Sequence, residues 1–346
     1  MDMIKNKPFL TDEKVDDFTP EDFVFVHRNE ELLDEAYTAT SYAKDVWMHF
    51  KKNKGAVLGA IIIIAIILLA IIGPMISGYK ADAINLDVQS LPPRIQGIYK
   101  LGIFSGYEKG VDQYAAHGVS QAFYWFGTDT NGRDLFTRVW EGTRVSLIIA
   151  LSAVVIDIVI GMSYGLISGY FGGKVDMVMQ RFMEILNGIP TLVVVTLLGL
   201  VLPPGITSIV FALMITGWIG MARIARAEVL KLKESEFILA SRTLGAKNFS
   251  IIFKEVMPNI FGQLIVMSMF SIPNAIFTEA FLSFVGLGIQ APDASLGSLI
   301  SDGYKSLTGH PHIIMSAIIV LALLMLSFNL FADGIRDAFD PNQKQR

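Results

Sequence analysis

Long stretches without Asp, Glu, Lys or Arg constrain this chain more than any other feature. Residues 185–222 are 38 consecutive uncharged residues, which as one helix would be about 57 Å long at 1.5 Å per residue. That length is nearly twice the hydrocarbon core of a bilayer, about 30 Å, which about 20 apolar residues cross. The Pro-Pro-Gly triplet at 203–205 cannot continue a helix. The stretch therefore predicts two membrane spans, about 183–202 and 206–223, joined by a tight turn.

Four other stretches predict spans of the same kind, at about 55–78, 145–168, 256–278 and 313–332. The first follows some fifty residues rich in charge, so it is interpreted as a span and not as a signal peptide. With 52% hydrophobic and only 17% charged residues, a soluble fold would have to hide too much apolar surface. We therefore predict an all-α polytopic membrane protein with six transmembrane helices.

The distribution of Lys and Arg predicts that both ends of the chain are cytoplasmic. In that orientation 20 of the 28 Lys and Arg residues lie on the cytoplasmic side, where short connections are enriched in positive charge. Most of the others lie in the first outer loop, which is long enough to be exempt from this rule. The predicted parts are a cytoplasmic tail 1–54, a first transmembrane helix 55–78, an extracytoplasmic loop 79–143, a core 144–334 with five helices, and a cytoplasmic tail 335–346.

Several kinds of chemistry are not expected in this chain. There is no cysteine, and the net charge of −4 does not suit a nucleic-acid partner. The sequence contains no phosphate-binding loop of the form G-x-x-x-x-G-K-[ST] and no metal-binding or hydrolase motif. His310 and His312 flank a loop proline and are interpreted as a solvated pair in preference to metal ligands. We expect no catalytic residue, cofactor or metal ion in this chain.

Three carboxylates, Asp157, Glu184 and Glu279, fall in or near predicted spans. A charge at membrane depth is expensive, and such residues often belong to a functional pathway. A proton or cation relay is one interpretation. The other is a packing or cavity-lining role, which we favour because no basic residue lies near the centre of any predicted span.

The longest cytoplasmic connection, 223–258, is predicted to be structured. Ser235 can begin a helix of about nine residues that Gly245 ends, and Asn248 can begin a second helix that ends before Pro258.

One face of the first loop helix combines apolar and small side chains. At spacings of three and four residues this face holds Phe237, Ala240, Ser241 and Leu244. The small residues let another backbone approach closely, which suits docking into the groove of a partner protein. The alternative is an amphipathic helix that lies on the lipid surface.

The same segment resembles the EAA loop of binding-protein-dependent ABC importers. Gly245 and Pro258 have the spacing of that motif, and Ala240 takes the middle position of its E-A-A triplet. The positions that depart from the motif are Leu239, Ser241, Glu255 and Met257.

Other segments are similar to the C-type permease subunit of the oligopeptide, dipeptide and nickel branch. They include Asn53-Lys54-x-Ala56-Val57-Leu58-Gly59, Gly127-Thr128-Asp129-x-x-Gly132-Arg133-Asp134, Gly142-x-Arg144-x-Ser146-Leu147, Gly169-Tyr170-x-Gly172-Gly173-x-x-Asp176, Leu282-Ser283-Phe284-x-Gly286-Leu287-Gly288 and Asp333-Gly334-x-Arg336-Asp337-x-x-Asp340-Pro341. The resemblance covers about 47–341, and 94–125 look inserted relative to shorter relatives.

The resemblance implies a type I permease fold and a place in a larger complex. This subunit and a homologous B-type permease subunit would form the pore, two cytoplasmic ATPase subunits would bind ATP and Mg²⁺, and an extracytoplasmic binding protein would deliver peptide. The complex would lie in the cell membrane of a prokaryote. The residues implied in coupling to the ATPases are Glu236, Phe237, Ala240, Ser241, Arg242, Leu244, Gly245, Ala246 and Pro258.

Two other classes of function remain as alternatives. A secondary transporter driven by an ion gradient predicts inverted repeats and partnered intramembrane charges, and a membrane scaffold predicts no transport. The cargo is open between oligopeptides, dipeptides, nickel and glycosides, and the sequence does not identify the residues that line the pore.

Overall fold

The computed structural model describes residues 42–203 and 205–339. Most of the predicted N-terminal tail and the end of the C-terminal tail therefore lie outside the described residues. The chain divides into two compact units, Met1–Asp45 and Val46–Arg346. The fold below is that of the second unit.

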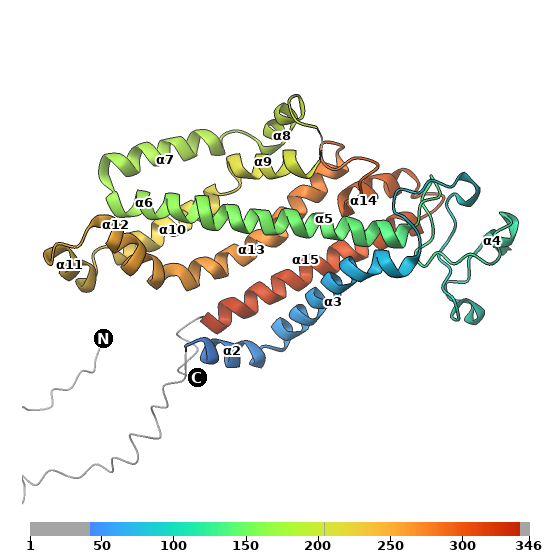
Figure 1. The fold of residues 1–346 in the computed structure, drawn as a ribbon, viewed down its shortest axis with the longest axis horizontal. Coiled ribbons are helices and arrows are strands. Elements are labelled where there is room, and N and C mark those ends of the chain that lie inside the picture. Colours follow the sequence, from blue (N-terminus) through green and yellow to red (C-terminus); the bar gives the residue numbers. More distant parts are fainter. Residues whose placement is uncertain (1–41, 204, 340–346) are drawn as a thin grey trace, which may run out of the picture. The chain divides into compact units, whose positions relative to one another are not determined.

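Helices make up most of the second unit (Figure 1). In chain order the elements are α2 (Tyr42–Lys52), α3 (Lys54–Ser77), the short 3₁₀ turns η3 (Leu86–Val88) and η4 (Tyr99–Leu101), strands β1 (Tyr107–Glu108) and β2 (Val111–Asp112), α4 (Gln113–Ala116), α5 (Leu135–Ile156), the π-helical segment η5 (Asp157–Met162), α6 (Ser163–Phe171), α7 (Gly173–Asn187), α8 (Thr191–Gly199), α9 (Ile206–Thr216), α10 (Ile219–Leu232), α11 (Glu236–Thr243), α12 (Asn248–Ile251), the π-helical segment η6 (Ile252–Val256), α13 (Met257–Phe284), α14 (Leu296–Lys305) and α15 (His312–Phe339). β1 and β2 form an antiparallel hairpin.

Among the described residues, five helical stretches are long and apolar enough to cross a membrane. They are Lys54–Ser77, Leu135–Phe171, Ile206–Leu232, Asn248–Phe284 and His312–Phe339. The bent pair of α7 and α8 would make a sixth crossing if it is one span. The prediction of a polytopic all-α membrane protein is confirmed, with five or six candidate spans.

The predicted third span, 183–202, is wrong in its start and in its straightness. α7 begins ten residues earlier, at Gly173, and the axes of α7 and α8 differ by 72°. Pro190 stands before α8 as its N-cap, and proline disfavours a helical conformation in the residue that precedes it. The absence of charge does not mark most of α7 as a span, because that helix carries Lys174, Asp176, Arg181 and Glu184.

The helices that contain the predicted spans 145–168 and 256–278 extend beyond both predicted bounds. α5, η5 and α6 form one helical stretch of 37 residues, and α12, η6 and α13 form another of 37 residues. Arg144 and Glu279, just outside these predicted bounds, are hydrogen-bonded inside the protein, so they do not end the helices.

Arg144 is one such residue, in the part of α5 that packs on α3. Its Nη2 and Nε donate to the Ala70 carbonyl at 2.8 and 3.3 Å. Pro74 stands four residues after Ala70 and has no N–H to give that carbonyl. Arg144 therefore supplies a hydrogen bond that the α3 helix cannot make for itself.

Glycines allow two pairs of helices to pack closely. Gly161, Gly165 and Gly169 form a stripe at four-residue spacing against α10, where a Cβ on Gly165 would lie 2.3 Å from the Ala222 carbonyl oxygen. A Cβ on Gly334 of α15 would lie 2.0 Å from the Cβ of Ala56 in α3. Small residues at such spacing are typical of helix contacts in membranes.

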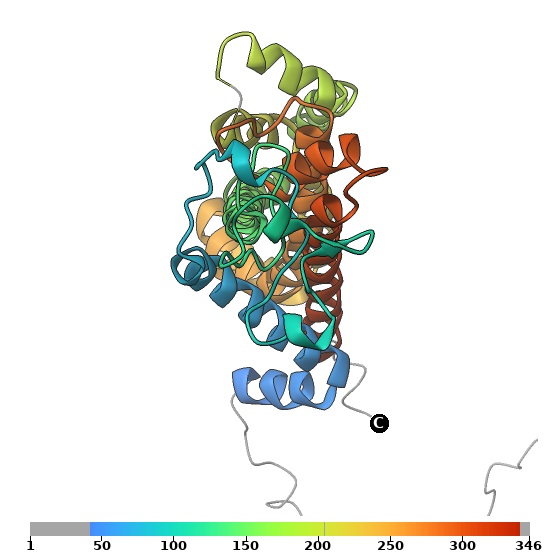
Figure 2. The same ribbon diagram turned by 90° about the vertical axis from the view of Figure 1, so that its right-hand side faces the viewer.

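The segment predicted as an insertion, 94–125, folds around Arg94. The guanidinium carbon of this buried side chain lies 4.8 Å from the ring centroids of Tyr99 and Tyr114 and 5.4 Å from that of Phe123. Figure 2 looks onto the end of the bundle at which these segments lie. This segment therefore packs around a cation held between aromatic rings, and its Tyr114 shares a cluster with Val88 and Leu91.

We expect Gly165→Ala to lower the midpoint of thermal unfolding of the purified protein in detergent, measured by intrinsic tryptophan fluorescence. The added Cβ would force α6 and α10 apart, and overpacking of this kind costs about 1–3 kcal/mol. Gly220→Ala is the matched control, because nothing lies within 4 Å of its Cβ position. Equal midpoints for the two variants would contradict the close approach of α6 and α10.

Candidate functional site

The first candidate site is the helical hairpin formed by α11 and α12. The sequence correctly predicts where α11 ends. Gly245 has φ +83°, and its N–H donates to the Arg242 carbonyl at 3.0 Å while the N–H of Ala246 donates to the Ser241 carbonyl at 3.1 Å. These two bonds form a Schellman motif, in which glycine takes the left-handed position without strain.

The sequence prediction is wrong about the second loop helix. Lys247 and not Asn248 precedes its first turn, and the helix does not end before Pro258 but continues through η6 into α13. Pro258 has no N–H for the carbonyl four residues before it, and the π-helical turn of η6 lies directly before this site. A local change of hydrogen-bond register of this kind lets a helix accommodate a proline. Ser235 precedes α11 as predicted, but its hydroxyl makes no capping hydrogen bond.

The inner side of the hairpin is fixed to α6 and α10. Ile238, Ile251 and Ile252 are fully buried in a cluster with side chains of both helices. The Tyr170 hydroxyl donates to Oδ1 of Asn248 at 3.1 Å, and the Arg242 guanidinium lies 5.1 Å from the Tyr170 ring centroid. α11 is therefore held rigidly against the bundle.

The outer side of the hairpin leaves large apolar side chains exposed. We call these side chains, together with the small exposed Ala240, the α11 surface: Phe237, Leu239, Ala240, Leu244, Phe249 and Phe253. Leu244 is 88% and Phe249 is 63% exposed. Phe237, Ala240 and Leu244 lie on this side as the spacing predicts, whereas Ser241 is partly buried. Exposed apolar side chains on a rigid scaffold are typical of an interaction site.

The remaining residues of the predicted coupling set lie around this surface. Glu236, Arg242 and Gly245 are exposed and Ala246 is partly buried. Pro258 is exposed near the start of α13.

Next to the hairpin, an ion pair joins α7 to α10. Arg226 donates to both carboxylate oxygens of Asp176 at 2.6 Å, and the Ser168 hydroxyl also donates to Asp176. A bidentate pair fixes geometry more firmly than a single contact. Asp176 belongs to a motif that the sequence analysis singled out, but Arg226 was missed because fifty residues separate the pair.

The three predicted membrane carboxylates have different surroundings. Glu184 is exposed and pairs with Arg181 at 2.6 Å, so it is not an interior charge. Glu279 is completely buried and accepts hydrogen bonds from Ser146 at 2.6 Å and Ser283 at 2.8 Å. Asp157 is buried at the start of η5 and accepts a hydrogen bond from Ser271 of α13.

The motif around Asp129 lies at the end of the bundle opposite to α11. Oδ1 of Asp129 accepts the N–H groups of Asn131 and Arg133 at 2.9 Å, and its Oδ2 accepts Nε of Arg133 at 2.7 Å. Asp134 begins α5 by accepting the Thr137 N–H. Burial raises the pKa of the Asp134 carboxyl above its usual range, and the hydrogen bonds from Thr137 oppose that rise.

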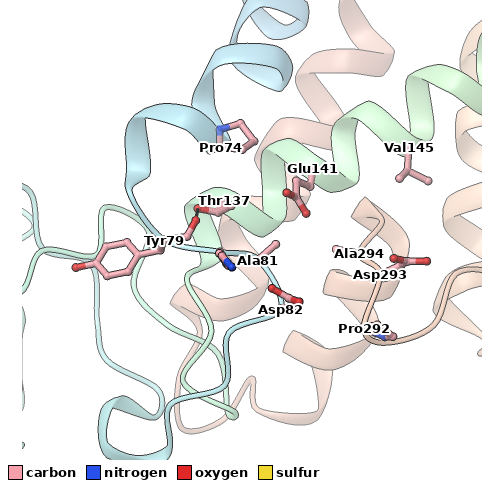
Figure 3. Close-up of a pocket in the computed structure, with 11 residues that line it drawn as sticks. Pro74, Tyr79, Ala81, Asp82, Thr137, Glu141, Val145, Pro292, Asp293 and Ala294 are labelled. Atoms are coloured by element: carbon pink, nitrogen blue, oxygen red, sulfur yellow. Dashed lines mark hydrogen bonds between the residues drawn. The ribbon is translucent and has the colours of Figure 1, made fainter.

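A cleft of about 460 Å³ lies beside this motif (Figure 3). Asp82, Glu141 and Asp293 are among the residues that line it, and they come from three different parts of the chain. Behind it, Nη1 of Arg138 donates to the carbonyl oxygens of Ala81 at 3.0 Å and Pro292 at 3.4 Å. Among the described residues, no group of three His, Cys, Asp or Glu side chains is placed to hold a metal ion.

We expect Gly245→Val to loosen α11 and Gly245→Asn to preserve it, because asparagine tolerates the left-handed conformation and a β-branched residue does not. Nothing lies within 4 Å of the Cβ position, so the effect would come from the backbone and not from a clash. Hydrogen exchange of the amides of residues 238–244 measures it. Equally fast exchange in the two variants would contradict the role of the positive φ angle.

Comparison with known proteins identifies the family. Residues 161–345 match the model of the binding-protein-dependent transport system inner membrane component, and residues 41–93 match that of the N-terminal TM domain of oligopeptide transport permease C. The dipeptide transport system permease protein DppC of Bacillus subtilis is 40% identical over 98% of this chain and 100% of its own length. The oligopeptide transport system permease protein OppC of the same organism is 42% identical over 87% of this chain and 90% of its own.

Among solved structures, an inward-facing MetNI methionine ABC transporter chain has 18% identity and a TM-score of 0.49, over 59% of this chain and 97% of its own. The family model that matches 161–345 covers more than half of the chain, and both relatives cover most of it. This chain belongs to the family of binding-protein-dependent transport system inner membrane components.

Proposed function

We propose that this chain is a pore-forming permease subunit of an ATP-driven importer of peptides. The observation that carries the proposal is the α11 surface, a rigidly anchored helical hairpin with exposed apolar side chains. Family membership supports transport, and the exposed hairpin supports a separate protein that drives it.

ATPase subunits are the partner that we propose for the α11 surface. Phe237 and Leu244 would enter a groove of an ATPase, and Ala240 would lie where the two backbones come closest. Glu236, Ser241, Arg242, Gly245, Ala246 and Pro258 would support this contact. ATP and Mg²⁺ would bind to the ATPases, since the sequence of this chain contains no phosphate-binding loop.

The proposed orientation puts α11 and both tails in the cytoplasm of a prokaryotic cell. The abundance of Lys and Arg in the short connections on that side supports it. Residues 79–134 would then face outward, where an extracytoplasmic binding protein would deliver the cargo. A homologous B-type permease subunit would complete the pore.

Short peptides are the cargo that we propose. The two relatives compared above are named as dipeptide and oligopeptide permeases, with 40% and 42% identity, so their similarity does not separate the two peptide lengths. No observation on the described residues favours a secondary transporter, because Glu279 and Asp157 contact serines and not basic partners.

Deletion of the gene should prevent growth when an essential amino acid is supplied only within di- to hexapeptides. The reason is that the remaining subunits would lack half of the pore. The measurement is the growth of the deletion strain on each peptide length, with the free amino acid as the control. Undiminished growth on every peptide length, in a strain with no second peptide importer, would argue against peptide cargo.

Ala240→Trp should reduce both transport and the amount of ATPase that co-purifies with this chain. The residue is exposed, so the larger side chain would fit the isolated subunit but would block a close approach from outside. Overpacking an interface costs about 1–3 kcal/mol, roughly 5- to 160-fold in affinity.

Ala116→Trp is the matched control, because Ala116 is an exposed helical alanine at the other end of the bundle. It should leave ATPase recovery unchanged. If α11 instead lies on lipid, Ala240→Trp should be harmless, since tryptophan favours the membrane interface. Full recovery of ATPase with full transport at equal membrane abundance would therefore remove the coupling assignment.

A further inference from the structure

Two interruptions of helical structure and a proline-containing helix meet at one place in the bundle. η5 is a π-helical segment, the short break at Gly217–Trp218 separates α9 from α10, and Pro273 lies within α13. η5 and the break are in direct contact, because a Cβ on Gly161 would lie 2.8 Å from the Trp218 carbonyl oxygen. Asp157 of η5 also reaches α13 through its hydrogen bond with the Ser271 hydroxyl.

Asp157, Gly217 and Ser271 each lie in the middle third of their membrane-spanning stretch. Asp157 belongs to Leu135–Phe171, Gly217 to Ile206–Leu232, and Ser271 to Asn248–Phe284. Irregular backbone at such depth is tolerated where protein buries it or where it lines a water-filled cavity. π-helical turns also occur frequently at functional sites.

A small cavity of about 50 Å³ lies where the three stretches meet. Its polar lining consists of Asp157, Ser271, Asn274 and Thr278, and Gly217 also borders it. This volume has room for a few water molecules. Ser271, Asn274 and Thr278 follow one another along α13 at spacings of three and four residues, so they lie on one face of that helix.

The Asp157 carboxylate is only partly satisfied by the described residues. Ser271 supplies one hydrogen bond to it, whereas an ionised carboxylate can accept about four. None of the residues that line the cavity is basic. Glu279 is the contrasting case, since two serines bind it and it lines none of the described pockets.

We propose that this cavity is a subsite of the translocation path. In it the Asp157 carboxylate accepts hydrogen bonds from the ammonium and amide N–H groups of a passing peptide, and Ser271 and Asn274 provide further polar contacts. A carboxylate without a basic neighbour at membrane depth favours a cationic or hydrogen-donating ligand. The chemical class of the ligand rests on the proposed function, whereas the position of the path does not.

The charge is tested by Asp157→Asn in the assembled complex with all partner subunits. Asparagine has nearly the same shape and keeps an acceptor for the Ser271 hydroxyl, so packing is retained while the negative charge is lost. We expect peptide transport to fall about tenfold or more, with unchanged subunit recovery and thermal midpoint. Wild-type transport by Asp157→Asn would overturn the role of the carboxylate.

Glu279→Gln is the control for a carboxylate that serves packing. We expect it to lower the thermal midpoint of the complex, because it disturbs the hydrogen bonds with Ser146 and Ser283. A transport loss in Asp157→Asn that is matched by an equal loss of thermal stability would assign Asp157 to packing and overturn the proposal.

Water access is tested independently of the cargo. The natural chain has no cysteine, so Asn274→Cys gives it a single thiol, and a charged thiosulfonate reagent is applied to the complex in membranes. We expect this thiol to react, at a rate that changes when nucleotide is trapped in the ATPases. Ile64→Cys is the matched control, an exposed mid-span position of α3, and should not react because it faces hydrocarbon or protein.

The outcomes separate the two proposals. Undiminished growth of the deletion strain on every peptide length, together with nucleotide-dependent labelling of Asn274→Cys, would remove peptides as cargo and retain the path. An unreactive Asn274→Cys in every nucleotide state would overturn the translocation path at this cavity.

Discussion

The lack of hydrogen-bond partners in hydrocarbon is the constraint on which the rest of this structure depends. A proline in a spanning helix leaves a carbonyl without its helical donor, and in α3 the chain meets this need with Arg144, whose guanidinium donates twice to the Ala70 carbonyl. The same constraint explains why Glu279 is accepted in the core, where two serine hydroxyls donate to it. The bonds from Arg144 to Ala70 and from Ser146 to Glu279 join helices that are far apart in sequence, so the same hydrogen bonds satisfy polar groups and fix which helices are neighbours.

The two ends of the bundle differ in the side chains that they present. At the end near Asp129, the Asp129 carboxylate binds Arg133, and the Arg138 guanidinium joins the segment at Ala81 to the loop at Pro292. These bonds hold the segments at this end in fixed positions relative to one another. At the end near α11, the hairpin is anchored by buried isoleucines but leaves Leu244 and Phe249 in the open, which suits contact with another protein.

The hydropathy of the sequence predicts helices and their approximate places, but not their ends or bends. The Schellman motif at Gly245 could be predicted because all of its residues are local. The length of α5 could not be predicted, because the charge of Arg144 is accommodated by a hydrogen bond to Ala70 of α3, which is 74 residues away in the chain. The bend at Pro190 was missed because the span was predicted from the absence of charge alone, and Arg226 was missed because nothing near it in sequence marks Asp176 as its partner. Asp157 was found as an isolated charge, but its cavity depends on three helical stretches that only the fold brings together.

The packing of α11 bears on how the two proposed sites would communicate. α11 contacts α6 and α10 through the cluster that contains Ile238. Traced toward the middle of the membrane, α6 runs into η5 and α10 ends at the break before Ile219, so both helices lead to the cavity at Asp157. A displacement of α11 by a bound partner would be carried along two helices that are stiff because glycines let them pack closely. It would be absorbed where the backbone departs from the α-helix, since hinges are the few positions that take up changes in backbone angle. The interruptions at mid-depth would thus both line the path and let it change shape.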